Sequence, residues 1–334
     1  MNNTSNSLVS GIDPASFSAV TGPSQDLFRF VNGPWVDMYR LPDDRSRYGS
    51  FDKLAEDAEN QIRDILEEDD CPAVKSRALY HSFLDVDAID AAGLAAIEDQ
   101  LASIDEAEDK AALTRALGAM NPTGGPDLIG IAVYGDPGAP ETNVVHIEQD
   151  GLDLPDEAYY REDHYAPIRE AYVEMVAKQL KNAHLAADDE DAHAQAKRFL
   201  DVETRIAANH WDNVSTRDSV KTYNPTDYAD LCAMLADVDL DAWIDAWQNA
   251  YDATTAAAVQ PLDFRGCFSH TIVHEPSFLT GLNAFWKEAS LDDLKLWARV
   301  HVVIGSTLEL PHEFDETNFD FYGKTLSGQK EQRV

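Results

Sequence analysis

The sequence has few basic residues for a chain of 334 residues. Lysine and arginine together number 26, whereas aspartate and glutamate number 61, which gives a formal net charge of −35 at pH 7. Nucleic acids and anionic membrane surfaces attract basic proteins, and their phosphates would repel a protein of this charge. The charge balance therefore excludes nucleic acid and membrane surfaces as expected partners.

Cysteines and long apolar runs are also scarce. The three cysteines, an odd number, predict no disulfide framework and a reducing compartment. No apolar run approaches the about 18 residues of a membrane span. The first residues have neither the basic nor the apolar region of a secretion signal. We expect a soluble, cytoplasmic protein.

Hydrophobic residues are plentiful, at 44% of the chain, so a sizeable core can form. Apolar residues recur at helical spacing through most of the sequence. This spacing predicts helices over 73–86, 89–103, 108–120, 165–183, 190–210, 226–236, 239–252, 277–288 and 291–308. Two strand-like runs, 127–135 and 143–149, flank a turn. The predicted fold is mainly α, a large multi-helical domain with a small antiparallel β element.

Another strong helix is predicted from Ser50, which suits an N-cap, to the acidic cluster before Pro72. Asp52 falls near the positive end of this helix. Its apolar positions follow one face, and they are Phe51, Leu54, Ala55, Ala58, Ile62 and Ile65. This face needs a packing partner.

Two histidines and a carboxylate lie close together in FSHTIVHEPSF, residues 268–278. His270 and His274 are four residues apart, a spacing that suits one metal ion only on a helix. The three residues between them are β-branched and Pro276 follows, which predicts a strand. A strand would separate the histidines by roughly 13 Å, too far for one zinc ion. We therefore expect a short strand here and no metal site.

Six blocks of sequence, in order along the chain, carry a resemblance. They are VNGPW (31–35) and RYGSFD (47–52) within 26–66, ALYHSFLD (78–85), HIEQDGLDLPDEAYY (146–160), VETRIAANHWDNVSTRDSVKTYN (202–224) and NFDFYGKTLSG (318–328). Together they resemble the N-terminal portion of the M13 (neprilysin-like) zinc metallopeptidases, from about residue 25 to the end of the chain.

In that family, a thermolysin-like catalytic lobe and a large helical lobe enclose a central cavity. The resemblance implies that 69–316 is the helical gating lobe and that 21–68 packs on the catalytic lobe. Residues 1–20 would be a loose lead, and 317–334 a polar loop. The zinc-binding H-E-x-x-H motif of the family lies beyond the last block. We therefore expect no catalytic residue and no bound zinc in this chain, and zinc in the full-length enzyme.

The resemblance also implies three substrate-binding residues. Arg47 resembles the arginine that meets the C-terminal carboxylate of a short peptide, which a guanidinium fork suits. Phe51 resembles an aromatic residue of the S1′ pocket, and Asp52 a polar neighbour that holds the arginine. Ala55 departs from the pattern, because some members have a second arginine there. From the residues alone, Arg47 could simply pair with an acid of the helix, and Phe51 could be part of a core.

Two functions follow as hypotheses. The first is the N-terminal segment of a zinc metalloendopeptidase that cleaves small peptides, inactive until joined by the missing C-terminal catalytic segment. The second is a stand-alone, non-catalytic helical module that binds peptides or a protein partner. In either case we expect the apolar face of the 50–66 helix to be exposed or buried by self-association.

Overall fold

The structure is a computed structural model that describes residues 12–68, 70–255 and 261–333. Its contacts divide the chain into two units. Unit 1 comprises Met1–Gln61 with Gln329–Val334, and unit 2 comprises Ile62–Gly328. Residues 1–11 of the predicted lead lie outside the described residues. The predicted domain boundaries stay a prediction.

Unit 1 contains short helical elements with little burial. They are η1 (Pro14–Ser16), α1 (Leu27–Met38) and the first part of α2 (Ser50–Glu67). Asp26 caps α1 by accepting a hydrogen bond from the backbone N–H of Arg29 at 2.9 Å. Among the described residues of unit 1, only Gly33 is buried. Burial within the unit therefore contributes little to its order.

Unit 2 is mainly helical, as predicted. Its helices are α3 (Val74–Leu84), α4 (Val86–Ala92), α5 (Glu98–Glu106), α6 (Lys110–Met120), η2 (Asn121–Thr123), α7 (Ala158–Arg161), η3 (Asp163–Tyr165), α8 (Ala166–Asn182), α9 (Asp189–Ala207), η4 (Ser215–Arg217), α10 (Tyr228–Met234), α11 (Leu240–Thr254), α12 (Phe264–Cys267), α13 (Pro276–Glu288), α14 (Leu291–Gly305), α15 (His312–Asn318) and η5 (Phe319–Leu326). The single helix predicted over 89–103 is wrong, because Gly93 has a φ of +59° and separates α4 from α5.

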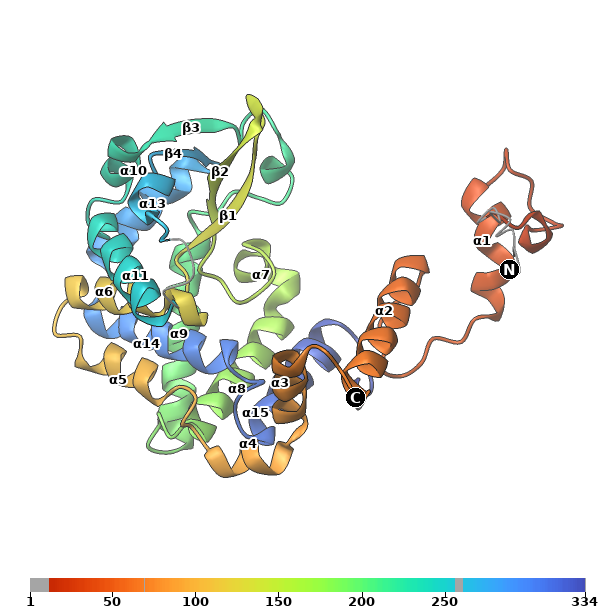
Figure 1. Cartoon of the computed structure of the whole chain (residues 1–334), viewed down its shortest axis with the longest axis horizontal. Coiled ribbons are helices and arrows are strands. Elements are labelled where there is room, and N and C mark those ends of the chain that lie inside the picture. Colours follow the sequence, from red (N-terminus) through yellow and green to blue (C-terminus); the bar gives the residue numbers. More distant parts are fainter. Residues whose placement is uncertain (1–11, 69, 256–260, 334) are drawn as a thin grey trace. The chain divides into compact units, whose positions relative to one another are not determined.

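The strands of unit 2 form one four-stranded sheet within the described residues. They are β1 (Ile129–Asp136), β2 (Ala139–Gln149), β3 (Asn224–Asp227) and β4 (His270–Val273), in the order β1-β2-β4-β3. The predicted antiparallel hairpin is β1–β2, and the expected short strand at 270–273 is β4. β2 and β4 pair in parallel. The strands gather at one end of unit 2 (Figure 1).

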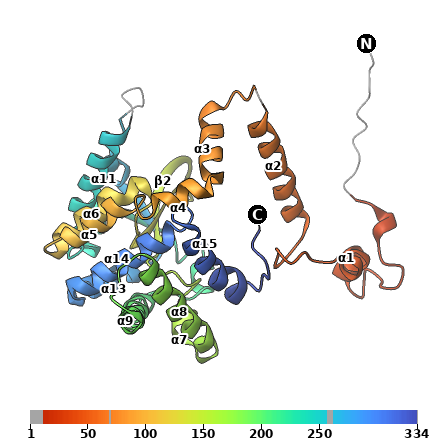
Figure 2. The ribbon, with the colours of Figure 1, turned by 90° about the horizontal axis from the view of Figure 1, so that it is seen from below.

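The core of unit 2 is continuous and rich in aromatic residues. Helices α8, α9 and α14 lie in mutual contact, and Figure 2 shows them as neighbours. Phe199, Trp286 and Trp297 are fully buried. Ser290 caps α14 by accepting a hydrogen bond from the backbone N–H of Asp293 at 3.1 Å. No helix in the described residues is both long and apolar enough to cross a bilayer.

The polar loop predicted over 317–334 is wrong as far as Leu326. Residues 312–326 form α15 and the π-helical η5 instead. Phe314 and Phe321 are buried, and both elements contact α8. Two aromatic side chains in a polar stretch thus supply enough burial to hold a helix there.

Candidate functional site

The three residues implied by the resemblance lie at the start of α2. The Nε of Arg47 is 3.6 Å from Oδ1 of Asp52, and the arginine side chain is 87% exposed. Phe51 is 86% exposed, so it belongs to no core within the described residues. The start of α2 therefore presents an exposed cation and an exposed aromatic ring to solvent.

Aromatic side chains support the turn that precedes α2. Trp35 stacks on Tyr39 at 4.7 Å between ring centroids, and Tyr39 stacks on Tyr48 at 4.9 Å. The hydroxyl of Tyr48 donates to Glu56 at 2.8 Å, and this hydrogen bond raises the pKa of Tyr48 to about 12. Arg45 lies 5.2 Å from the centre of the Tyr48 ring. The backbone on either side of Arg47 is therefore fixed by contacts within unit 1.

The last described residues pair with the segment before α2. The backbone N–H of Lys330 donates to the carbonyl oxygen of Asp43 at 3.0 Å, and its Nζ lies 2.6 Å from the carboxylate of Asp43. Arg333 forms an ion pair with Glu59 of α2. We call residues 329–333 the C-terminal strap.

Strand β4 separates the two histidines that raised the question of a metal. His270 lies 3.5 Å from the carboxylate of Asp136, whereas His274 contacts His146 of β2. The facing nitrogens, Nδ1 of His146 and Nε2 of His274, are 2.9 Å apart, and the ring centroids are 5.2 Å apart. The two nitrogens thus point at one another, which suits one shared proton. Metal ligands instead converge on the ion at an angle.

The described residues do not fit a zinc centre. Within them, no group of three or more histidine, cysteine, aspartate or glutamate side chains is arranged to hold a metal ion. The Nε2 of His146 is buried and has no hydrogen-bond partner among the described residues. Burial lowers the pKa of His210 to about 4, so this side chain is neutral near pH 7.

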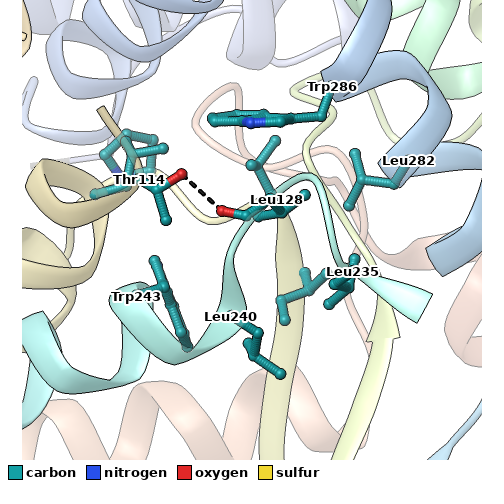
Figure 3. A pocket seen from close by; sticks show the side chains of 11 residues that line it. Thr114, Leu128, Leu235, Leu240, Trp243, Leu282 and Trp286 are labelled. Carbon is teal, nitrogen blue, oxygen red and sulfur yellow. Dashed lines mark hydrogen bonds between the residues drawn. The ribbon is translucent and has the colours of Figure 1, made fainter. Parts of the chain in front are cut away.

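A small apolar cavity lies between α6, α11 and α13 (Figure 3). Its volume is about 20 Å³. The side chains that line it include Leu128, Leu240, Trp243 and Trp286. The hydroxyl of Thr114, also in the lining, donates a hydrogen bond to the carbonyl oxygen of Val238 at 2.8 Å. A cavity of this size admits about one water, so it is a packing defect and not a substrate site.

A buried polar network in unit 2 escaped the sequence analysis. It joins side chains from three of the six recognised blocks, namely Asp153 and Tyr160, Glu203, and Tyr322. Acidic residues are rarely buried, so a glutamate within helix α9 gave no sign of its environment. The available signal was the polar and tyrosine content of those blocks.

A family model and a curated relative both match most of this chain. The family model for the N-terminal part of Peptidase family M13 matches residues 23–334. Human neprilysin is 24% identical over 92% of this chain, and the match covers 44% of neprilysin. The chain spans about half the length of the relatives it matches.

Solved structures of two bacterial proteins share the fold. Zmp1 from Mycobacterium tuberculosis, in complex with an inhibitor, is 31% identical with a TM-score of 0.84, over 98% of this chain and 49% of that one. In its open state the TM-score is 0.75, over 94% of this chain and 47% of that one, with 30% identity. PepO from Lactobacillus rhamnosis is 18% identical with a TM-score of 0.72, over 94% of this chain and 48% of that one, a likeness of fold alone.

Proposed function

The chain belongs to peptidase family M13, and we propose that it is the N-terminal segment of a zinc metalloendopeptidase that cleaves small peptides. The match over residues 23–334, against relatives about twice as long, is the observation that carries this proposal. In the proposal, unit 2 restricts access to the substrate cavity and the start of α2 contributes to the substrate site.

In this proposal, the catalytic zinc ion is bound outside the described residues of this chain. Because the described residues do not fit a zinc centre, we assign the ion and the hydrolytic step to a complementary C-terminal segment. The 334-residue chain alone would then hydrolyse no peptide. An internally quenched peptide, incubated with zinc-loaded chain free of contaminating proteases, tests this. Steady cleavage that co-purifies with the chain would contradict the assignment of the hydrolytic step to the C-terminal segment.

Arg47 is proposed to bind the C-terminal carboxylate of the peptide. Its exposure and its single 3.6 Å ion pair with Asp52 support this role, since the guanidinium can still form a bidentate pair with a carboxylate. Phe51 would contact the neighbouring peptide side chain, and Asp52 would orient Arg47. Because Ala55 offers no second cation, we expect the preference for free C-termini to rest on Arg47 alone.

Apolar residues exposed along α2 are proposed to pack on the catalytic segment. Phe51, Leu54, Ile62 and Ile65 are all exposed. A stripe of this kind on a helix normally marks an interface. In the isolated chain the same residues should promote self-association, which sedimentation would detect as dimers or larger species. A strictly monomeric chain would count against this interface.

The decisive experiment uses the protein from its native host. A product of about twice 37.0 kDa that carries one zinc ion supports the proposal. A product of 37.0 kDa without zinc would favour the stand-alone binding module instead.

The three cysteines are free in the described structure, which supports a proposed cytoplasmic location. A disulfide in the native-host protein would contradict this location.

With active native-host enzyme, Arg47→Ala tests the substrate contact. We expect KM for peptides with a free C-terminus to rise by roughly tenfold or more, since a charge-assisted pair is lost. C-terminally amidated peptides should be affected little. Arg63→Ala, on the same helix, is the matched control. An equal loss for free and amidated peptides would reject the proposed role of Arg47.

A further inference from the structure

Glu203 of α9 is a carboxylate sealed inside unit 2. It is 0% exposed and accepts hydrogen bonds from the hydroxyls of Tyr160 at 3.1 Å and Tyr172 at 2.8 Å. The backbone N–H of Asp153 donates to its other oxygen at 2.9 Å. An ionised carboxylate in such a place requires a compensating charge, because burial strongly disfavours an unpaired ion.

His301 of α14, when protonated, supplies the positive charge next to the carboxylate of Glu203. Its Nε2 lies 3.2 Å from Oε1 of Glu203 and has no hydrogen bond of good geometry to any described residue. The rings of Phe199 and Trp297 lie 5.5 Å and 4.6 Å from the imidazole ring. The attraction between His301 and Glu203 is therefore electrostatic and shielded from water.

A second carboxylate links this pair to the segment at which the chain leaves unit 2. The hydroxyl of Tyr322 in η5 donates to the carboxylate of Asp153, whose backbone is held by Glu203. The indole of Trp297 donates to the carbonyl of Gly151 at 3.1 Å and holds the same loop. Unit 2 ends at Gly328, only a few residues after Tyr322.

We propose that Glu203 and His301 retain one proton inside unit 2, and that this proton keeps the contact between Asp153 and Tyr322 closed. The network is then a pH-dependent anchor for the segment at which the chain leaves the unit. The proposal concerns the chain itself and does not depend on the proposed peptidase function.

The charges that face the pair support this arrangement. They are the carboxylates of Asp153 and Asp150, while the side chains of Tyr160, Tyr172 and Tyr322 are neutral donors. Loss of the shared proton would leave the fully buried Glu203 and the half-buried Asp153 as neighbouring anions. Their repulsion would push the loop at Asp153 away from α9 and weaken its bond to Tyr322.

The pKa values of Glu203 and His301 are both raised in the folded protein. Burial raises the pKa of Glu203, against the lowering effect of His301. Burial alone would lower the pKa of His301, but Glu203, Asp153 and Asp150 outweigh it and raise the pKa. Groups whose pKa is raised on folding contribute stability at low pH that is lost as the pH rises. For Glu203 the loss begins above its ordinary pKa near 4.3, and for His301 above about 6.5.

The test uses the 334-residue chain. Deuterium exchange of residues 319–328, corrected for the intrinsic effect of pH, should become at least about tenfold faster between about pH 6 and pH 8.5. The ring resonances of His301 should titrate above pH 6.5. Glu203→Gln removes the buried anion and should abolish most of this pH dependence. Tyr322→Phe removes the anchoring hydroxyl and should give fast exchange of 319–328 at every pH.

The matched control is the exposed pair of His193 and Glu174, whose Nε2–Oε2 distance is 2.8 Å. His193→Gln should leave the pH dependence of 319–328 unchanged. If Glu203→Gln retains the wild-type pH dependence, the anchor is not governed by this proton. Titration of His301 below pH 6.5 in the wild-type chain would also overturn the proposal, and this measurement decides it if Glu203→Gln fails to fold.

Discussion

Unit 2 fully buries Phe199, Trp286 and Trp297, whereas unit 1 leaves Trp35 and Phe51 open to solvent. Both units contain amphipathic helices and clusters of aromatic side chains. They differ in what covers the apolar faces. Unit 2 covers them with its own helices and sheet, and unit 1 relies on hydrogen bonds, stacked rings and ion pairs.

This difference shows what an amphipathic pattern does and does not establish. The spacing of apolar residues in α2 predicts both a helix and an apolar face. The helix is present, but Phe51, Leu54, Ile62 and Ile65 remain exposed along it. Periodicity therefore identifies a face that needs burial without identifying the surface that buries it.

The two units should differ strongly in their response to the removal of one aromatic ring. Phe199→Ala should lower the free energy of unfolding of unit 2 by about 3–5 kcal/mol, since the ring is fully buried. Phe51→Ala should change stability by less than about 0.5 kcal/mol, since its ring is exposed. Urea titration followed by near-ultraviolet circular dichroism compares the two. Equal losses would mean that α2 has a packing partner within this chain.

One helical glycine in each unit gives a second test of how tightly the units are packed. A Cβ on Gly118 of α6 would lie 2.3 Å from the carbonyl oxygen of Trp243, so Gly118→Ala should destabilise unit 2 by about 1–3 kcal/mol. A Cβ on Gly33 of α1 would meet nothing closer than 3.7 Å. Gly33→Ala should therefore stabilise α1 slightly, by up to about 1 kcal/mol. Thermal melts of both variants test this, and a harmless Gly118→Ala would show that α6 and α11 pack loosely.

The smallest expected effect concerns the C-terminal strap. Lys330→Ala removes an exposed ion pair with Asp43, and exposed pairs are weak. Amide exchange of Lys330 and Glu331, whose N–H groups donate to the carbonyl of Asp43, should accelerate by less than about fivefold. Added salt should reproduce most of this effect. Lys324→Ala, which removes a local pair with Asp320, should leave these two amides unchanged.

Much of the fold was predictable because local signals agree with it. The apolar spacing over 291–308 predicted α14, and the β-branched residues between His270 and His274 form β4. Errors arose where one residue changed the local outcome. Gly93 divided a predicted helix, and Phe321 turned a predicted loop into a packed helix.

The candidate site was less accessible to sequence reasoning. Arg47, Phe51 and Asp52 were selected by resemblance, and their role in binding stays a prediction. The contact between His146 and His274 depends on the parallel pairing of β2 with β4, which joins residues more than one hundred positions apart. The burial of Glu203 depends on contacts with α7, α8, α14 and the loop at Asp153. Neither arrangement has a local sequence signal.

The C-terminal strap also has a consequence for the order in which the chain is made. Asp43 and Lys330 are 287 positions apart. At about 5–20 residues per second, a ribosome takes roughly 15–60 seconds to synthesise that interval. Throughout this period the segment around Asp43 and Glu59 lacks its ion-pair partners Lys330 and Arg333. Unit 1 can therefore be completed only after synthesis has passed through the whole of unit 2.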